Sequence, residues 1–205
     1  MNNISKKTIS RVLLYIRTLE TLIIEERFFV SSKELAQITG ISDVKIRKDI
    51  THFGKVGKPR VGYNALKLKQ VLENFLLHKK VIRVVLFGAG NLGTAIIKYP
   101  GFRKGKLKIV AAFDKSKRTI GKTINGVTIY SVKRAPEIIR KYKGDIGIIA
   151  VPEEAAQKVA DTIVRSGLTG IVNFSPTTIN VPENVLVKNI DLSITFLSLY
   201  CNAKR

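Results

Sequence analysis

A glycine-rich turn between an apolar run and an amphipathic helix limits most strongly how this chain can fold. Residues 88–93 read Gly-Ala-Gly-Asn-Leu-Gly and directly follow the β-branched run 81–87. In this pattern Gly88 permits a tight turn, Gly90 lets the backbone approach a pyrophosphate, and Gly93 lets the helix pack against the strand. The helix N-terminus then offers N–H groups and positive dipole to phosphate. The segment predicts a Rossmann-type dinucleotide site; a turn that binds no ligand is the alternative.

An acidic residue at the end of the next apolar run supports the dinucleotide reading. The run 107–113 ends at Asp114, 24 residues after Gly90. A carboxylate at this distance holds the adenosine ribose hydroxyls of NAD and repels the 2′-phosphate of NADP. Lys115, Lys117 and Arg118 bring positive charge to the same place. We therefore expect NADH or NAD⁺ as the ligand, while the strictness of the preference over NADP stays open.

The rest of the second half alternates short apolar runs with helical stretches. Further runs occupy 127–130, 145–151, 170–174 and 185–188, and the clearest helix between them spans 153–166. This alternation predicts an α/β fold with a doubly wound parallel sheet in residues 81–188. Residues 191–202 then place apolar side chains at helical spacing: Leu192, Phe196, Leu199 and Tyr200. A terminal helix of this kind must bury that stripe in its own chain or in a partner.

The first half carries the signals of a helix-turn-helix. Residues 9–23 have the apolar spacing of an amphipathic helix, and Ser31 with Glu34 forms a capping box that opens a second, short helix. Gly40 suits the left-handed position that ends it, and Ser42 caps a third helix that runs to about Phe53. A further helix over 64–79 completes a domain of residues 1–80.

The third helix and the segment after it have the residue pattern of a DNA-binding surface. Ile46, Ile50 and Phe53 share one side and should face the core. Basic and hydrogen-bonding side chains point the other way, with Arg47 on the flank: Lys45, Lys48, Thr51 and His52. The glycine-rich segment 54–63 follows as a hairpin or wing whose Lys55, Lys58 and Arg60 suit a minor groove. A solvated basic face on a structural helix is the alternative.

The charge of the chain also favours an anionic partner. The formal net charge is +21 over 205 residues, which is typical of nucleic-acid binding. Residues 1–80 hold 16 basic and 7 acidic side chains, and residues 81–205 hold 20 and 8. Because both halves are basic, charge alone does not locate the DNA-binding face.

The sequence lacks the residues that several classes of protein need for their function. The two histidines, His52 and His78, precede the dinucleotide segment, and no Cys/His cluster has metal-ligand spacing, so we expect no metal. Tyr99, Lys98 and Asp145 could move a proton, yet none lies in a recognisable dehydrogenase motif, which argues against an enzyme. One cysteine, no signal-peptide pattern and no apolar run of spanning length predict a cytoplasmic protein without a membrane segment. Two alternatives remain: a small NAD-dependent oxidoreductase with an N-terminal interaction domain, and a thiol sensor acting through Cys201.

Short motifs follow one another in a fixed order along nearly the whole chain. The first half has Ser31-Ser32-x-Glu34-Leu35-Ala36, Arg47-Lys48-Asp49, Phe53-Gly54 and Val61-Gly62-Tyr63. The second half has the loop 88–93, Tyr99-Pro100-Gly101-Phe102, Phe113-Asp114, Ala150-Val151-Pro152, Asn173-Phe174-Ser175-Pro176 and Val187-Lys188-Asn189-Ile190-Asp191. In this order they resemble the Rex family of redox-sensing transcriptional repressors.

The resemblance implies a homodimer in which the helix of residues 189–205 is swapped onto the partner subunit. It also implies that the protein binds a palindromic, AT-rich operator when NADH is low and leaves it when NADH binds, with NAD⁺ as a competitor that does not cause release. Arg17, Tyr99 and Asp191 would exchange hydrogen bonds as the nucleotide changes. Loop and resemblance together give the candidate nucleotide-binding residues: Gly88, Ala89, Gly90, Asn91, Leu92, Gly93, Tyr99, Asp114, Lys115, Val151, Pro152 and Asn173.

Two positions depart from the pattern of the resembled family. Pro59 stands where the family wing usually has arginine, and Arg60 stands at a glycine position. After Asp114, Lys115-Ser116-Lys117 replaces the second acid and the proline that are common there. These changes concern the wing tip and the adenosine end of the nucleotide site.

Overall fold

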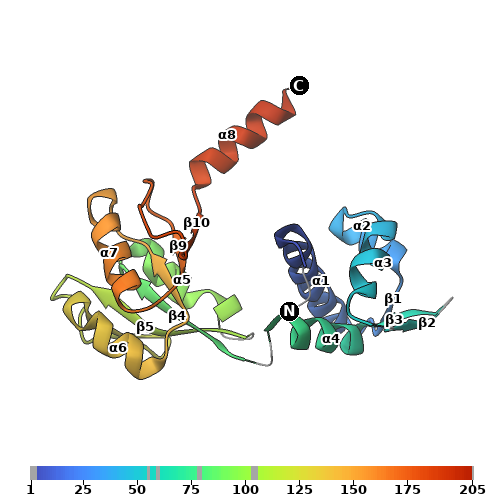
Figure 1. Ribbon diagram of the computed structural model, residues 1–205, viewed down its shortest axis with the longest axis horizontal. Coiled ribbons are helices and arrows are strands. Elements are labelled where there is room, and N and C mark those ends of the chain that lie inside the picture. The colour runs from blue at the N-terminus through green and yellow to red at the C-terminus, as the bar shows by residue number, and fades with distance from the viewer. Residues whose placement is uncertain (1–3, 55, 59–60, 78–79, 103–105, 205) are drawn as a thin grey trace. The chain divides into compact units, whose positions relative to one another are not determined.

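The computed structural model describes residues 4–54, 56–58, 61–77, 80–102 and 106–204. The chain forms two compact units, Met1–Lys80 and Val81–Arg205, and each is treated by itself (Figure 1). Across the described residues, no helix combines the length and the apolar character needed to cross a membrane.

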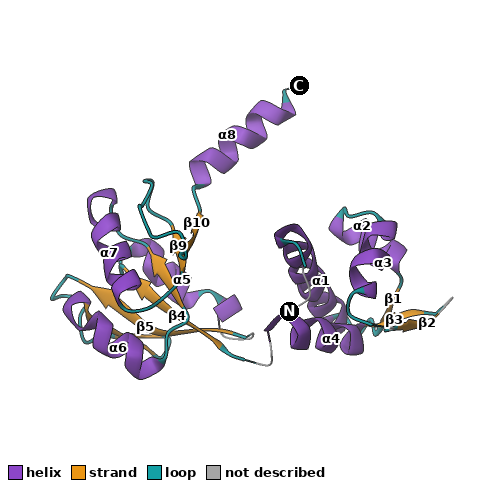
Figure 2. Cartoon of the chain, in the orientation of Figure 1, coloured by secondary structure: helices purple, strands orange, loops and turns teal. Residues whose placement is uncertain are grey.

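The first unit contains four helices and a small antiparallel sheet within its described residues. The helices are α1 (Lys6–Ile24), α2 (Ser32–Thr39), α3 (Asp43–Thr51) and α4 (Ala65–Leu77). The strands are β1 (Phe29–Val30), β2 (Gly57–Lys58) and β3 (Gly62–Asn64), in the order β1-β3-β2 (Figure 2). Strands β2 and β3 form the expected wing hairpin. Strand β1, which no sequence signal predicted, pairs with β3 and joins the wing to the helices.

Local signals fix the helix-turn-helix. The side chain of Ser31 accepts from the N–H of Glu34, and the Glu34 carboxylate accepts from the N–H of Ser31, so the predicted capping box is confirmed. Gly40 ends α2 in the left-handed conformation at φ 69°, as expected. Ser42 stands at the N-cap of α3 but makes no side-chain cap bond. Helix α3 ends at Thr51, two residues before the predicted end.

The second unit is built on one sheet. In its described residues the strand order is β10-β9-β8-β4-β5-β7-β6, and every pairing is parallel except that of β6 with β7. The strands are β4 (Ile82–Phe87), β5 (Leu107–Asp114), β6 (Thr123–Ile124), β7 (Val127–Ser131), β8 (Ile146–Ile149), β9 (Gly170–Asn173) and β10 (Leu186–Asn189). Counted along the chain, the parallel strands run 3-2-1-4-5-6, the order of a doubly wound dinucleotide fold. The predicted parallel sheet is confirmed. The hairpin of β6 and β7 was not predicted from the sequence.

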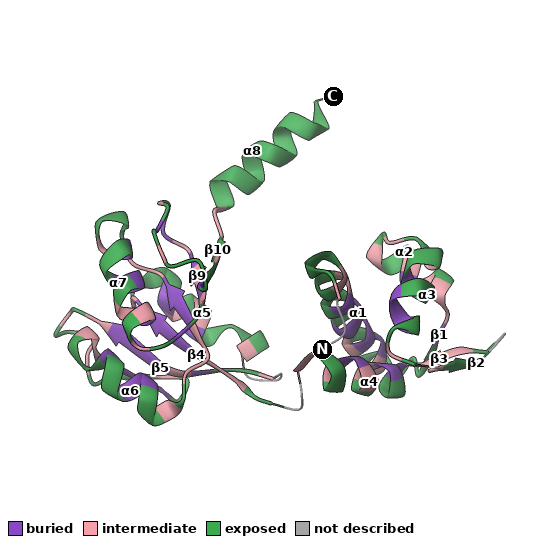
Figure 3. Ribbon diagram, viewed as in Figure 1, coloured by how far each residue is buried: buried purple, intermediate pink, exposed green. Residues whose placement is uncertain are grey.

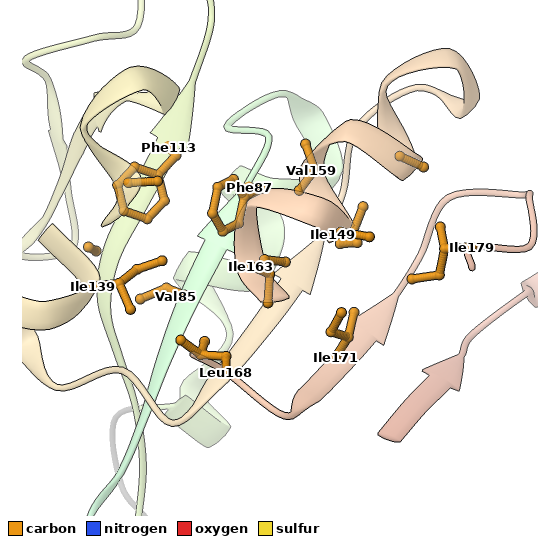
Figure 4. Packing of buried hydrophobic residues seen from close by; sticks show 14 of the residues in the cluster. Val85, Phe87, Phe113, Ile139, Ile149, Val159, Ile163, Leu168, Ile171 and Ile179 are labelled. Atoms are coloured by element: carbon orange, nitrogen blue, oxygen red, sulfur yellow. The ribbon is translucent and has the colours of Figure 1, made fainter. Parts of the chain in front are cut away.

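Helices cover the two faces of this sheet unequally. Helices α6 (Ala135–Tyr142) and α7 (Glu153–Arg165) pack on one face. There Ile139 and Ile163 lie against Val85, Phe87 and the neighbouring strands (Figure 4). The other face is covered by α5 (Asn91–Lys98) and the short 3-10 helix Pro100–Phe102, which pack over β4 and β5. The strands β8 and β9 on that side are covered less.

The terminal helix α8 (Leu192–Ala203) has no buried residue and is drawn as exposed along its length in Figure 3. The predicted apolar stripe is present, and its side chains are 58% to 70% exposed: Leu192, Phe196, Leu199 and Tyr200. The side chain of Asp191 caps this helix by accepting from the N–H groups of Ser193 and Ile194 at 2.8 and 3.3 Å.

Candidate functional site

The glycine loop between β4 and α5 is built so that two of its glycines have no room for a side chain. Gly88 has φ +97°, and a Cβ there would lie 2.2 Å from the carbonyl oxygen of Ala150. A Cβ on Gly93 would lie 1.8 Å from the carbonyl oxygen of Gly88. Both glycines therefore serve the close packing of strand, turn and helix.

Gly90 serves a different purpose. It is the N-cap of α5, and a Cβ added there would meet no protein atom within 4 Å. The fold itself therefore does not require glycine at this position. An open space in front of a helix N-terminus is where a pyrophosphate would lie against the backbone. The exposed Asn91 and Leu92, which open the helix, border the same space.

Asp114 contacts the glycine loop directly. Its Oδ2 accepts a hydrogen bond from the N–H of Ala89 at 2.8 Å, and its Oδ1 accepts from the N–H of Ser116 at 2.8 Å. The acid at the end of β5 therefore lies beside the turn at the end of β4. Each carboxylate oxygen keeps a further lone pair for a ribose hydroxyl. The exposed Lys115 and Lys117 follow directly.

The end of β8 forms the other wall of the loop. The backbone of Ala150 touches Gly88, and the N–H of Ala150 donates to the carbonyl of Phe87 at 2.8 Å. Val151 follows, and Pro152 is the N-cap of α7. This places Val151 and Pro152 beside the glycine loop, at the switch point where nucleotides bind in doubly wound sheets.

Asn173 and Tyr99 differ from the other candidate nucleotide-binding residues. The Asn173 side chain is fully buried, and its amide bonds to Thr177, Ser175 and Asn189. Tyr99 is the C-cap of α5, at the end of the helix away from the glycine loop, a separation of about 12 Å for eight helical residues. Its ring lies edge-on to Phe102 with 6.1 Å between centroids. The structure therefore does not bring Tyr99 together with the glycine loop.

Tyr99 instead borders an apolar hollow of 490 Å³ on the less covered face of the sheet. It is lined by residues of β4, α5, the 3-10 helix, β5, β8 and β9 and of the chain next to them: Val84, Ala95, Ile96, Tyr99, Phe102, Leu107, Ile146, Ile148, Val172, Phe174 and Ile190. The sequence gives no sign of this hollow, because its walls come mostly from apolar runs that are typical of buried strands.

The candidate DNA-binding face lies on α3 and the wing. Lys45, Lys48, Thr51 and His52 are exposed, whereas Ile46 and Ile50 are buried, so the predicted division of the helix is confirmed. Lys58 is exposed in β2.

Arg47, also exposed, forms an ion pair with Asp43 and donates to the hydroxyl of Ser32 at 3.2 Å. Arg60 and Lys55, with Pro59, lie outside the described residues.

A buried ionic group behind α3 is the residue set that sequence reasoning missed. The Asp49 side chain accepts from Arg11 Nε at 2.6 Å, from the second Arg11 nitrogen at 2.7 Å and from the Tyr15 hydroxyl at 2.9 Å. Burial works against the charged carboxylate, but the hydrogen bonds from Arg11 and Tyr15 outweigh it and hold the pKa of Asp49 below its ordinary value. An acid between Ile46 and Ile50, on the buried side of a basic helix, was the available signal.

Arg17 lies on the exposed side of α1, and Asp191 caps α8 in the other unit. In the described residues, no group of three or more His, Cys, Asp or Glu side chains could hold a metal ion.

Known proteins match both units. Residues 3–51 match a family model described as a putative DNA-binding protein N-terminus, and residues 79–177 match one described as a CoA binding domain. The redox-sensing transcriptional repressor Rex of Pelotomaculum thermopropionicum is 42% identical over 199 residues, which cover 97% of this chain and 93% of that protein. The chain belongs to the Rex family.

Solved structures of a Rex-family repressor, RSP, agree with this assignment. RSP in complex with β-NAD⁺ and operator DNA matches with a TM-score of 0.87 and 33% identity, covering 99% of this chain and 94% of that one. RSP in complex with β-NADH matches with a TM-score of 0.85 at the same identity, covering 99% and 95%. The Rex fold, a DNA-binding N-terminal domain joined to a Rossmann-like domain, is therefore the fold of this chain.

Proposed function

We propose that this chain is a transcriptional repressor that binds operator DNA when NADH is scarce and releases it when NADH binds. One observation carries the proposal: a dinucleotide loop closed by the Ala89–Asp114 hydrogen bond and a basic recognition helix occur in a single chain of the Rex family. The related RSP has been solved with β-NAD⁺ and operator DNA and with β-NADH.

On the DNA side, Lys45, Lys48, Thr51 and His52 reach the major groove, and the wing reaches the minor groove with Lys58 and Arg60. The exposure of these four residues supports this assignment. Arg47 leaves its ion pair with Asp43 and contacts a DNA phosphate instead. An exposed ion pair is weak enough for a stronger anion to replace one partner.

On the nucleotide side, the loop Gly88–Gly93 holds the pyrophosphate and Asp114 holds the adenosine ribose. Lys115 lies at the adenosine end, and Val151 with Pro152 borders the nicotinamide. Asn173 contributes the shape of its loop, because its side chain has no accessible surface. Asp114 also favours NADH and NAD⁺ over their 2′-phosphorylated forms.

We propose that the nucleotide acts as an effector and not as a hydride donor in a reaction. The two histidines of the sequence precede the Rossmann domain, and no motif of a dehydrogenase surrounds the loop. The Rex relatives are named as transcriptional repressors. A repressor works where the DNA is, so we place the protein in the cytoplasm.

The repressor is a homodimer in this proposal. The exposed apolar stripe of α8 needs a partner, and the apolar hollow beside Tyr99 needs an occupant. Residues 189–205 of one copy packing on a second copy would satisfy both. Arg17, Tyr99 and Asp191 then form the hydrogen-bonding set that responds to the nucleotide.

Fluorescence anisotropy with a labelled duplex tests the function. A palindromic AT-rich site is first selected from a random pool on the immobilised full chain, and NADH is then titrated in at fixed NAD⁺. We expect release as the NADH/NAD⁺ ratio rises and no release with NAD⁺ alone. Operator binding that ignores both nucleotides would contradict the proposal, as would steady consumption of NADH with a panel of carbonyl substrates.

A further inference from the structure

A buried amide network joins the loops at the carboxyl ends of β8, β9 and β10. The Asn173 side chain, at the end of β9, is fully buried. Its Nδ2 donates to the carbonyl of Thr177 at 2.8 Å and to Oδ1 of Asn189 at 3.0 Å, and its Oδ1 accepts from the N–H of Ser175 at 3.0 Å. Both amide protons and the amide oxygen are thus engaged. A buried amide with all its bonds made resists rearrangement, because each lost bond leaves an unsatisfied polar group.

On one side this network reaches the nucleotide loop. The Ser175 hydroxyl donates to the carbonyl of Val151 at 2.6 Å. The preceding residue, Ala150, has its backbone directly against Gly88, the first residue of the glycine loop. The path from Gly88 to Asn173 therefore runs through tightly packed backbone and two hydrogen bonds of Ser175.

On the other side the network reaches the start of α8. The N–H of Ile190 donates to the backbone carbonyl of Asn173 at 2.8 Å, next to the bond that the Asn173 amide makes to Asn189. Asp191 follows at once and caps α8. Asn173 thus holds the two residues that precede the cap of the terminal helix.

We propose that the bond between Asn173 and Asn189 is a positioning link through which the occupied nucleotide site sets the course of the chain into α8. The link rests on the proposed function, in which α8 belongs to the dimer interface. A ligand shifts the balance between two arrangements of a protein only if it binds one of them more tightly. The network connects the nucleotide loop to the start of α8, so that one arrangement can be common to both. Asn189 is exposed, so its bond to the buried amide is not needed to fill the core.

Three variants of the full chain test the link. Asn189→Ala removes the acceptor, Asn189→Asp keeps an acceptor oxygen at the same place, and Lys188→Ala is a neighbouring exposed control on β10. Two quantities are measured: the NADH-dependent change in amide hydrogen exchange of residues 189–195, and the ratio of operator dissociation constants with and without NADH.

In the wild type we expect NADH to change exchange in residues 189–195. In Asn189→Ala we expect that change to vanish and the operator ratio to fall about five-fold, the effect of one hydrogen bond, with unchanged NADH affinity. Asn189→Asp and Lys188→Ala should behave as wild type. An exchange response in Asn189→Ala equal to that of the wild type overturns the link, and so does a loss of NADH affinity in that variant.

The outcomes separate the link from the function. If NADH leaves operator binding unchanged in the wild type, the proposed repressor function fails, and the exchange data still decide the link. If NADH binds without altering exchange in residues 189–195, the link fails whether or not the operator is released.

Discussion

The guanidinium of Arg11 in α1 grips the carboxylate of Asp49 in α3 with two hydrogen bonds of 2.6 and 2.7 Å. Asp49 is 2% exposed, and the Tyr15 hydroxyl fills a third position on it at 2.9 Å. These bonds hold the buried side of α3 against α1, while Lys45 and Lys48 stay exposed on the other side of α3. The orientation of the candidate DNA-binding face on α3 is therefore set in part by a carboxylate that is itself buried.

Asp49→Asn should destabilise the N-terminal domain by about 3 kcal/mol, because it leaves the partly buried Arg11 without its counter-charge. Tyr15→Phe keeps the ion pair and should lose only about 1 kcal/mol, the contribution of one hydrogen bond. Urea unfolding followed by circular dichroism gives both values. Equal losses in the two variants would show that the charge pair adds nothing beyond an ordinary hydrogen bond.

The same pair predicts a pH dependence. The pKa of Asp49 is lowered in the folded state, so the pair contributes its full stability above the unfolded pKa of about 3.9 and loses it as the pH falls through the lower folded pKa. The difference in urea midpoint between wild type and Asp49→Asn should be constant near neutral pH and shrink below about pH 4. A difference that grows as acid is added would contradict this sign.

Gly90→Val should abolish nucleotide binding and leave the Rossmann domain folded. A side chain there meets no protein atom within 4 Å, but it fills the space in front of the α5 N-terminus. Gly93→Ala is the matched contrast, since its Cβ would lie 1.8 Å from the Gly88 carbonyl oxygen and should lower the melting temperature. Calorimetric NADH titration and thermal unfolding separate the two effects. NADH affinity retained in Gly90→Val would place the pyrophosphate elsewhere.

Lys48→Ala tests the DNA-binding face. If Lys48 meets a phosphate, the variant should weaken binding to all duplexes and reduce the slope of log affinity against log salt by about 0.9. If Lys48 contacts a base, the variant should weaken binding to the specific site only. Lys158→Ala, an exposed lysine of α7, is the control. Anisotropy at several salt concentrations makes the measurement, and wild-type affinity on every duplex would remove Lys48 from the interface.

Phe196→Glu tests the role of α8 in dimer formation. The charge enters the apolar stripe and should return the protein to the 22.8 kDa of one chain. Ser198→Glu, on the opposite side of the helix, should keep twice that mass. Light scattering coupled to gel filtration measures both. A Phe196→Glu protein that stays dimeric would mean that the stripe is buried elsewhere.

The sequence determined the parts of this protein that depend on short-range signals. The capping box of Ser31 and Glu34, the left-handed Gly40 and the periodicity of α3 operate within a few residues, so they can be read along the chain. The loop 88–93 with Asp114 is also readable, because its glycines act through backbone geometry that any strand–turn–helix shares. The alternation of apolar runs and helices likewise predicted a parallel, doubly wound sheet, and the structure then supplied the order of its strands.

Only the tertiary structure decided which distant side chains meet. The partners Arg11 and Asp49 are 38 residues apart, and Asn173 and Asn189 are 16 apart, so no local pattern pairs them. The two-residue strands β1 and β6 likewise exist because a neighbouring strand accepts them, since two residues have too little propensity of their own. The tertiary structure also separated the roles of the glycines in the loop. Packing against Ala150 means that the fold requires glycine at position 88, whereas the open space around Gly90 means that glycine there serves ligand binding.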